Sequence, residues 1–350
     1  MPGQWEMLRE LDRAGVRIVL GVWGGPAQFT DDGQRRGKLL SRHYDDYVEY
    51  VVSLVAFLVG QQHLPVWAIT VANEPDCGDG NQIPPHGFAY IAHQLATRLV
   101  LCGVQLDGPD TTTAGAAMDY LPLLLDDPVV ANDLAFVGFH QYSGDPSVGV
   151  VSDYVHAQRP ELPVVVTEYT SFNYGDLDAG QEASSPLDFA LDIADTVLAH
   201  YRLGADAALF WDTIDYLQPG HDAITSWGLL RSPAEGFARR EWYYGLLQIL
   251  PYLQPGTHVL ETNREGGEDL GLLAVRLADE RVVLLFVNQH YAAIDMYLNL
   301  STTMGNLPDS FALTRTDVMS ADLAVGRVEL EDGAGRVRLP GRSITTLQSS

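Results

Sequence analysis

The chain has 350 residues, a formal net charge of −25 at pH 7, 46% hydrophobic residues and a single lysine, Lys38. This length and composition allow one large globular domain or two ordinary ones, and they exclude a disordered or fibrous chain. The negative charge excludes nucleic acid and anionic membranes as favoured partners, whereas a neutral ligand such as a sugar chain is unaffected.

Targeting signals are weak in this sequence. The longest apolar run, residues 51–60, is about half of the ~20 residues needed to cross a bilayer, so we expect a buried helix there. Residues 1–15 are amphipathic and lack an apolar core, so we expect no signal peptide in this chain. Localisation is left unknown: a start lost upstream would allow secretion, and otherwise the chain would be cytoplasmic.

Residues 1–249 alternate helix and strand patterns in chain order. Helices are expected near residues 3–14, 41–60, 87–102, 119–131, 151–159, 186–203 and 235–249. Strands are expected as apolar runs at residues 16–23, 66–73, 104–113, 134–142, 162–169 and 205–212. Such runs are typical of a parallel sheet buried on both faces, and their alternation with helices predicts an α/β fold, a (β/α)8 barrel of the TIM type.

The count of strand-plus-helix units is about six, whereas a closed barrel needs eight. We therefore expect a barrel domain over residues 1–249 that lacks its first two βα units. Residues 250–350 change to short β-rich runs separated by Gly, Asp and Asn turns, which predicts a small antiparallel β-sandwich domain. Cys77 and Cys102 flank an expected helix, so we predict two free thiols.

Two glutamates stand where apolar strands end. The run VWAITVANEPD (66–76) places Glu74 directly behind a strand, and LPVVVTEYTSF (162–172) does the same for Glu168. They lie about three units of ~31 residues apart, so both would face the same end of a barrel. Two carboxyl groups presented in this way are what retaining glycoside hydrolysis needs, one as proton donor and one as nucleophile.

Other catalytic motifs are absent from the sequence. No Gly-x-Gly-x-x-Gly opens a helix after a strand, and neither a Walker motif nor a Gly-x-Ser-x-Gly elbow is present. Cys77 and His86 lack the spacing of metal ligands, and the polar turn at residues 76–81 departs from calcium-loop patterns. We therefore expect neither a cofactor nor a metal.

The order of the remaining motifs resembles that of the clan A retaining glycoside hydrolases: Asn-Glu-Pro at one strand end, a His-x-Tyr strand, a second Glu strand and a Trp strand. Within the clan, GVWGGPAQF, LLSRHYDDYVEYVVSLVAFL and ITVANEPD resemble glycoside hydrolase family 30, with families 5 and 39 as near alternatives. YYGLLQILPYLQPGTHVLE and LPGRSITTL resemble the sandwich attached to family 30 barrels. The resemblance spans residues 5 to 348, but the first two barrel strands and the N-terminal sandwich strands of the family are lacking.

The resemblance implies a role for each matching polar residue. Glu74 matches the acid/base and Glu168 matches the nucleophile. Asn73 matches the residue that hydrogen-bonds the 2-hydroxyl group of the sugar. Tyr142 matches a donor to the nucleophile, and His140, two residues before it on the same side of the strand, matches a residue near the sugar.

Aromatic residues are the second implied group. Trp211 matches the stacking floor for the sugar at the cleavage site, and Trp23 matches a Trp-x-x-Pro strand end that contacts substrate. Tyr169 and Trp227 lie on loops expected to face the same mouth of the barrel. Weaker candidate contacts on such loops are Tyr174, Asp212, Asp215 and His221.

The sequence thus predicts a retaining glycoside hydrolase that cleaves a neutral β-linked glycan or glycoside by double displacement. Two alternatives stay open. The missing strands motivate a non-catalytic carbohydrate-binding or scaffold protein derived from such an enzyme. A transglycosylase would share every residue and differ only in the acceptor of the intermediate.

Overall fold

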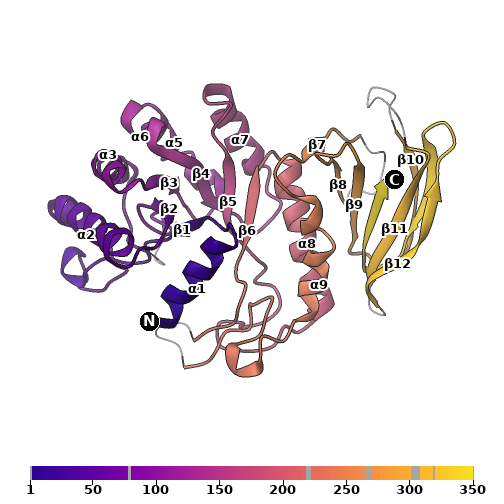
Figure 1. Cartoon of the computed structure of the whole chain (residues 1–350), viewed down its shortest axis with the longest axis horizontal. Coiled ribbons are helices and arrows are strands. Elements are labelled where there is room, and N and C mark those ends of the chain that lie inside the picture. The colour runs from indigo at the N-terminus through magenta and orange to yellow at the C-terminus, as the bar shows by residue number, and fades with distance from the viewer. Residues whose placement is uncertain are drawn as a thin grey trace. The chain divides into compact units, whose positions relative to one another are not determined.

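The computed structural model describes residues 2–77, 80–217, 222–263, 265, 270–300, 308–317 and 320–349. The chain forms two compact units (Figure 1). The first comprises Met1–Gln141, Pro146–Glu168 and Gly204–Ala207, and the second comprises Tyr142–Asp145, Tyr169–Leu203 and Ala208–Ser350. The predicted domain boundary at residues 249/250 stays a prediction, and each unit is described by itself.

A parallel sheet organises the first half of the chain. In the described residues it has six strands in chain order, with β1 at one edge and β6 at the other. The strands are β1 (Ile18–Leu20), β2 (Val66–Thr70), β3 (Gln105–Pro109), β4 (Leu134–His140), β5 (Val164–Tyr169) and β6 (Ala207–Phe210). The central strands β2 to β5 are buried along nearly their whole length, which explains why β2, β4 and β5 are mainly apolar runs. The predicted parallel α/β sheet is therefore confirmed.

Helices of the first unit form a layer beside this sheet (Figure 1). α2 (Tyr44–Ala56) buries Tyr47, Val48, Val51 and Val55, a spacing that places one face of the helix on the sheet. α3 (Pro85–Leu99) begins at Pro85, whose missing N–H costs nothing at a first helical position. The other helices of this unit are α1 (Pro2–Arg13), α4 (Ala114–Ala117), α5 (Leu121–Leu125), α6 (Pro128–Asp133) and α7 (Ser147–Gln158).

Two local predictions were wrong. The Leu-rich helix expected near 119–131 is broken into α5 and α6, because Asp127 caps a new helix that starts at Pro128. The helix expected near residues 41–60 does not begin as an α-helix at its first residue: Ser41–His43 form a single 3₁₀ turn, and α2 starts after it at Tyr44. Both predicted free thiols are confirmed.

The second unit is built on antiparallel sheets. Its larger sheet has six described strands in the order β12-β11-β14-β9-β8-β7, and β10 pairs with β13 in a second sheet. The strands are β7 (His258–Leu260), β8 (Leu270–Arg276), β9 (Val282–Asn288), β10 (Ile294–Asn299), β11 (Ser310–Asp317), β12 (Ser320–Glu329), β13 (Ala334–Leu339) and β14 (Ser343–Ser349). Leu298 and Leu339 of the small sheet share one core with Phe286 and Phe311 of the large one.

Two helices complete the second unit. α8 (Pro186–Arg202) and α9 (Glu241–Leu247) pack together, and α8 also contacts β8 and β9 (Figure 1). Gln248 joins α9 to the sheet, because its amide donates to the carbonyl of Ile344 at 3.1 Å. In the described part of the chain, no helix combines the length and the apolar character needed to span a membrane.

Candidate active site

Backbone hydrogen bonds continue beyond the strands of the first unit and join the ends of neighbouring strands. The Asn73 N–H donates to the Val22 carbonyl, and the Glu74 N–H donates to the Asp110 carbonyl, both at 2.9 Å. Asp110 in turn donates to Gly138 at 2.8 Å. These hydrogen bonds form a rim along the ends of the strands. The rim fixes the positions of the residues that come after the strands, because their backbones cannot move independently.

The rim continues from β4 to β5. The His140 N–H donates to the Thr111 carbonyl at 2.8 Å, and the Gln141 N–H donates to the Glu168 carbonyl at 3.0 Å. Glu168 lies on β5 itself, opposite His140 in the register of the two strands. Backbone pairing therefore brings the strand ends that carry Glu74, His140 and Glu168 together.

The two predicted catalytic glutamates face each other across His140. Both are buried, with Glu74 7% and Glu168 8% exposed, and an oxygen of each lies within 4.8 Å of the other. The Nδ1 atom of His140 is 2.8 Å from Oε1 of Glu74, and its Nε2 atom is 3.7 Å from Oε2 of Glu168. The structure thus brings together three of the residues proposed from sequence.

A fourth residue of this cluster, Asp110, was missed by the sequence analysis. Its Oδ1 atom lies 3.7 Å from Nε2 of His140, and the hydroxyl group of Thr167 donates to the same oxygen. Asp110 follows β3 directly, in the DGPDTTT turn. The available signal was its position at a strand end between two strands that carry candidate residues.

Charge in the cluster is unbalanced, because one imidazole faces three carboxylates. Burial alone would lower the pKa of His140, but hydrogen bonding to Asp110 and Glu74 and the charges of Asp110 and Glu168 raise it well above its usual value. The carboxylates around the ring thus favour the imidazolium form of His140. In that form its charge would offset the negative charge of the carboxylates that it faces.

Asp107 is a further buried carboxyl group beside this cluster. It is 2% exposed. Burial, reinforced by the charge of Asp110, raises the pKa of Asp107 well above its usual value. Both effects favour the neutral form of the Asp107 side chain.

The remaining predicted residues of the first unit are Asn73 and Trp23. Asn73 is buried at 3% exposure, and its Nδ2 atom has no hydrogen-bond partner among the residues described. An amide N–H in that state is available to a ligand hydroxyl group. Trp23 is half-buried, and the guanidinium group of Arg36 lies over its ring at 5.0 Å.

The other predicted aromatic residues belong to the second unit. Tyr142 stacks in a tilted arrangement with Phe172 at 4.7 Å, and Trp211 makes an edge contact with Tyr216 at 6.5 Å. Both are half-buried. Their substrate roles stay predictions, because they are placed only within their own unit.

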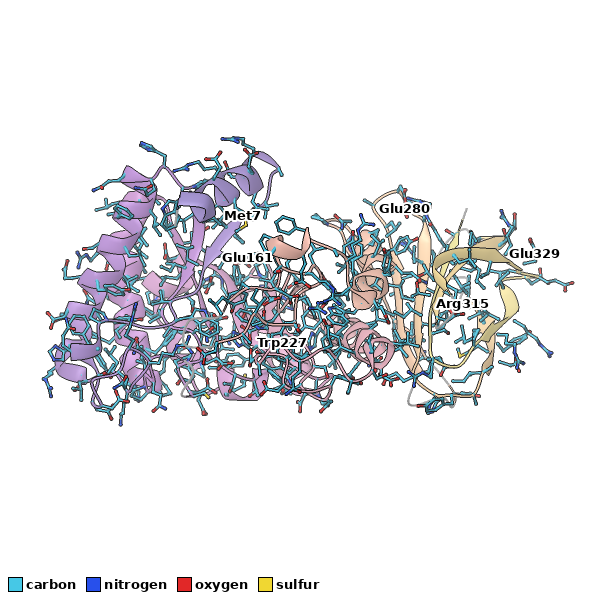
Figure 2. All side chains as sticks on the ribbon, turned by 90° about the horizontal axis from the view of Figure 1, so that it is seen from below. Met7, Glu161, Trp227, Glu280, Arg315 and Glu329 are labelled. Carbon is cyan, nitrogen blue, oxygen red and sulfur yellow. The ribbon has the colours of Figure 1, made fainter. Side chains whose placement is uncertain are left out.

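Tyr169 and Trp227 are packed inside the second unit. Tyr169 is 1% exposed and meets His200 and Phe210 edge to face. Trp227 is 2% exposed, donates its indole N–H to Asp178 at 2.8 Å, and is surrounded by other side chains (Figure 2). Both therefore offer little ring surface for stacking.

The weaker candidates from the sequence lie in different surroundings. Asp215 is buried in an ion pair with Arg240, whose Nη2 atom lies 2.6 Å from Oδ2 of Asp215, and this contact explains its presence structurally. Tyr174 packs on the ring of Phe189. Asp212 is half-buried. His221 lies outside the described residues.

Glu74, His140 and Glu168 also supply one atom each that a metal ion could bind, an imidazole nitrogen and two carboxylate oxygens. The geometry favours a proton-sharing cluster instead. Nδ1 of His140 is at hydrogen-bond distance from Glu74, while the opposite ring nitrogen faces Glu168.

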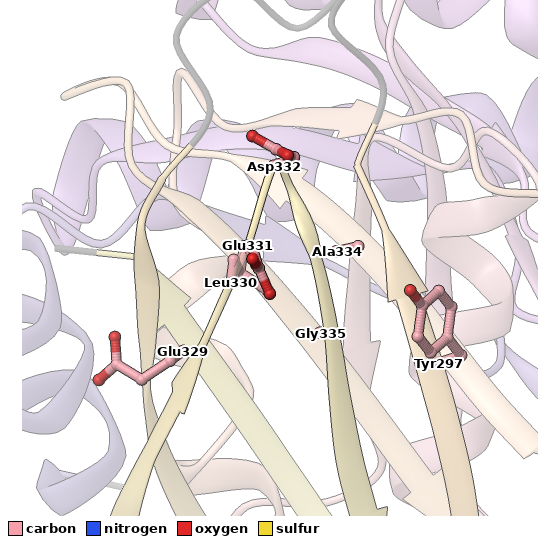
Figure 3. Close-up of a pocket in the computed structure, with 7 residues that line it drawn as sticks. All are labelled: Tyr297, Glu329, Leu330, Glu331, Asp332, Ala334 and Gly335. Atoms are coloured by element: carbon pink, nitrogen blue, oxygen red, sulfur yellow. The ribbon is translucent and has the colours of Figure 1, made fainter.

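Two open surface cavities lie away from these residues. One, of about 520 Å³, is lined in the second unit by Tyr297, Glu329 and the turn at Glu331 and Asp332 (Figure 3). The other, of about 450 Å³, lies in the first unit between Tyr44 and Tyr90 at the starts of α2 and α3. Neither includes a member of the carboxylate cluster.

Comparison with known proteins identifies the class of fold. No family model matches the chain, and no curated protein sequence matches it significantly. Solved structures do match: the fold is that of a TIM-type barrel together with an antiparallel sheet domain, as predicted.

Glycoside hydrolases are among the matching structures. The family 30 endoxylanase from Clostridium papyrosolvens C71 aligns with a TM-score of 0.75 at 17% identity, over 99% of this chain and 83% of that one. The catalytic domain of the family 30 xylanase C from Talaromyces cellulolyticus gives 0.73 at 16% identity, over 99% and 79%. An endo-β1,6-glucanase gives 0.67 at 15% identity, over 99% and 74%. The chain therefore has the glycoside hydrolase family 30 fold, in agreement with the sequence resemblance.

Proposed function

We propose that this chain is a retaining glycoside hydrolase that cleaves a β-glycosidic bond by double displacement. The observation that carries the proposal is the pairing of two buried carboxyl groups, Glu74 and Glu168, whose nearest oxygens lie within 4.8 Å. Retaining enzymes hold their carboxyl groups about 5–5.5 Å apart, whereas inverting enzymes need about 6.5–9.5 Å to admit a water molecule. The separation supports the retaining chemistry.

In the first step, the Glu168 carboxylate attacks the anomeric carbon of the sugar. The bond from that carbon to the leaving-group oxygen breaks as the Glu74 carboxyl group transfers its proton to this oxygen. The products are a free aglycone and a glycosyl ester on Glu168. The imidazolium of His140 beside Glu168 supports the role of that residue as an ionised nucleophile.

In the second step, water attacks the same carbon and the bond to Glu168 breaks. Glu74, now ionised, takes a proton from the water, so both carboxyl groups return to their starting states. The unpartnered Nδ2 atom of Asn73 suits a hydrogen bond to the sugar 2-hydroxyl group, a contact that strengthens in the transition state.

The substrate class we propose is a neutral β-linked glycan. The net charge of −25 disfavours acidic polysaccharides, since a polyanion would be repelled over the whole surface. Structures with this fold include xylanases and an endo-β1,6-glucanase. Xylan-type and β-glucan-type substrates are therefore the first to test.

The proposal includes an eight-stranded barrel, of which the described residues contribute six strands. β1 and β6 are the edge strands of the described sheet, and Leu209 of β6 is 47% exposed. Edge strands of this kind present unpaired backbone groups, which two further parallel strands would satisfy. Such strands would also restore the number that a closed barrel of this type requires.

A burst assay tests the function. Aryl β-xylosides and β-glucosides with a good leaving group are mixed with the chain, with Glu168→Gln as the variant and Glu161→Gln, a surface change, as its matched control. We expect release of aryl alcohol that falls at least about 10⁴-fold in Glu168→Gln and is unchanged in the control. Equal activity in both variants would overturn the assignment of the nucleophile.

The same assay separates the alternatives. Glycan binding by calorimetry without turnover, in a chain extended upstream as well as in this one, would identify a binding protein. Products longer than the substrate at high sugar concentration would identify a transglycosylase. Activity gained only in the extended chain would support the eight-stranded barrel.

A further inference from the structure

The carboxylate cluster contains one more charge than the double displacement needs. Glu74 and Glu168 have roles in the proposed reaction, whereas Asp110 takes no part in the bonds that form and break at the anomeric carbon. It is nevertheless 6% exposed, with its Oδ1 atom 3.7 Å from Nε2 of His140 and held there by the hydroxyl group of Thr167. A buried carboxylate is costly unless something requires it.

His140 has an acceptor on each side of its ring. Nδ1 faces Glu74 at 2.8 Å, and Nε2 faces Asp110 and Glu168 at 3.7 Å. A neutral imidazole has only one N–H, so one of these carboxylates would then face a lone pair. The doubly protonated ring presents an N–H to the carboxylates on both sides.

We propose that Asp110 is a positioning residue that keeps His140 doubly protonated. The Nδ1–H of His140 then donates a hydrogen bond to Oε1 of Glu74, and the acid proton of Glu74 stays on Oε2. This inference rests on the proposed function, because it assigns the direction in which Glu74 delivers its proton. With a neutral ring, Nδ1 could accept that proton from Oε1, and it would point away from the glycosidic oxygen.

Asp110 suits this role better than Glu168 does, although both are equally close to Nε2. Glu168 becomes a neutral ester in the glycosyl-enzyme, so its charge disappears between the two steps. Asp110 forms no bond with the sugar, so its carboxyl group is not consumed in either step. It can therefore hold the charge of His140 during both steps, including the second, when Glu74 must be an ionised base.

The backbone of Asp110 supports the same role. Its carbonyl accepts the N–H of Glu74 at 2.9 Å, and Glu74 and Asp110 both have left-handed backbones, with φ of 44° and 59°. Non-glycine residues adopt this conformation rarely, and the cost is offset by the surrounding hydrogen bonds. Asp110 therefore fixes Glu74 through its main chain and His140 through its side chain.

The test compares Asp110→Asn with Asp107→Asn. Both replace a buried aspartate by its isosteric amide, but of the two it is Asp110 whose carboxyl group is placed beside the His140 ring. Histidine ¹⁵N labelling and NMR titration report the protonation of His140 directly, with its signal assigned from a His140→Gln spectrum. Asp107→Asn keeps the three carboxyl groups that face His140, those of Glu74, Asp110 and Glu168.

We expect His140 to be doubly protonated at pH 7 in the parent chain. In Asp110→Asn its titration midpoint should fall by about one pH unit or more, and in Asp107→Asn by clearly less. The basic limb of the kcat/KM profile should move to lower pH by a matching amount in Asp110→Asn only, and Asp110→Glu should restore part of the shift.

A neutral His140 in the parent chain at pH 7 would overturn the proposal without any variant, which covers the case in which Asp110→Asn fails to fold. An equal fall in both asparagine variants would also overturn it. The NMR readout needs no turnover, so a chain without glycosidase activity whose His140 still responds to Asp110 would refute the proposed function alone.

Discussion

The main-chain N–H of Glu74 donates to the carbonyl of Asp110 at 2.9 Å, although the two residues follow different strands, β2 and β3. Both have positive φ angles. The side chain of each meets His140, Glu74 at Nδ1 and Asp110 at Nε2. A single pair of neighbouring turns therefore orients the proposed acid/base through one main-chain contact and one shared histidine.

Asn73→Ala should lower kcat/KM by about 10²-fold on an aryl β-glycoside. The buried Nδ2 atom of Asn73 has no partner among the described residues, so its removal leaves no protein group unsatisfied. A 2-deoxy glycoside provides the control: it lacks the hydroxyl group, so parent and variant should then differ by less than a few-fold. Equal losses on both substrates would show that Asn73 acts through the fold.

Gly138→Ala should lower activity through Thr167. A Cβ atom at Gly138 would lie 2.8 Å from Cγ2 of Thr167, which is too close, so the side chain that holds Asp110 must shift. We expect at least a tenfold loss of kcat with a minor change in thermal unfolding midpoint. The double variant Gly138→Ala/Thr167→Ser removes the methyl group and keeps the hydroxyl group, so it should recover most of the activity. A double variant as poor as the single one would contradict this route.

Part of the site could be predicted from the sequence. Continuous apolar runs indicated the parallel strands, and the strand ends then placed Glu74 and Glu168 in one region. Resemblance placed His140 near the sugar, but its approach to Glu168 depends on the register of β4 against β5. Asp110 stayed hidden, because a turn rich in Asp, Thr and Gly is typical of any loop.

The helices show a second limit of sequence patterns. The Leu-rich run at residues 119–131 has helical spacing, and the hydrophobic pattern therefore suggested one helix. Proline at the first turn is compatible with a new helix as well as with an interrupted one, and the cap at Asp127 decided between them. The barrel boundary at residues 249/250 stays a prediction, since the compact units divide the chain at other places.

His200 should make the protein less stable in acid. It is fully buried, its Nε2 atom lies 3.1 Å from the carbonyl of Ser143, and burial lowers the pKa of His200 to about 4. Between that value and about 6.5, the unfolded chain binds a proton that the folded chain does not. The free energy of unfolding therefore falls as pH drops through this window, by up to about 3 kcal/mol.

Urea unfolding of the parent and His200→Gln at several pH values between 4 and 7 measures this contribution. The variant should be less stable near pH 7, because the packing against Tyr169 is lost. Its stability should nevertheless depend less steeply on pH than that of the parent. Parallel pH profiles for the two proteins would rule out His200 as the source.

Arg240→Met should destabilise the protein by about 3–5 kcal/mol, because it leaves Asp215 as a buried and uncompensated carboxylate. Both Nε and Nη2 of Arg240 donate to Asp215, and both side chains are buried. The double variant Asp215→Leu/Arg240→Met removes both charges and should be clearly more stable than the single one. Chemical unfolding of the two variants checks the order, and a double variant as unstable as the single one would show that packing dominates.

The backbone rim around Glu74 and His140 has a consequence for how the site fails. Five residues that follow or end strands each donate a main-chain hydrogen bond to a neighbouring strand end. They are Asn73, Glu74, Asp110, His140 and Gln141. Amides of ordinary loops exchange with solvent quickly, but these should exchange slowly and at one common rate. The site would then open as one unit, so that heat or denaturant would abolish it in a single step, well before the sheet itself comes apart.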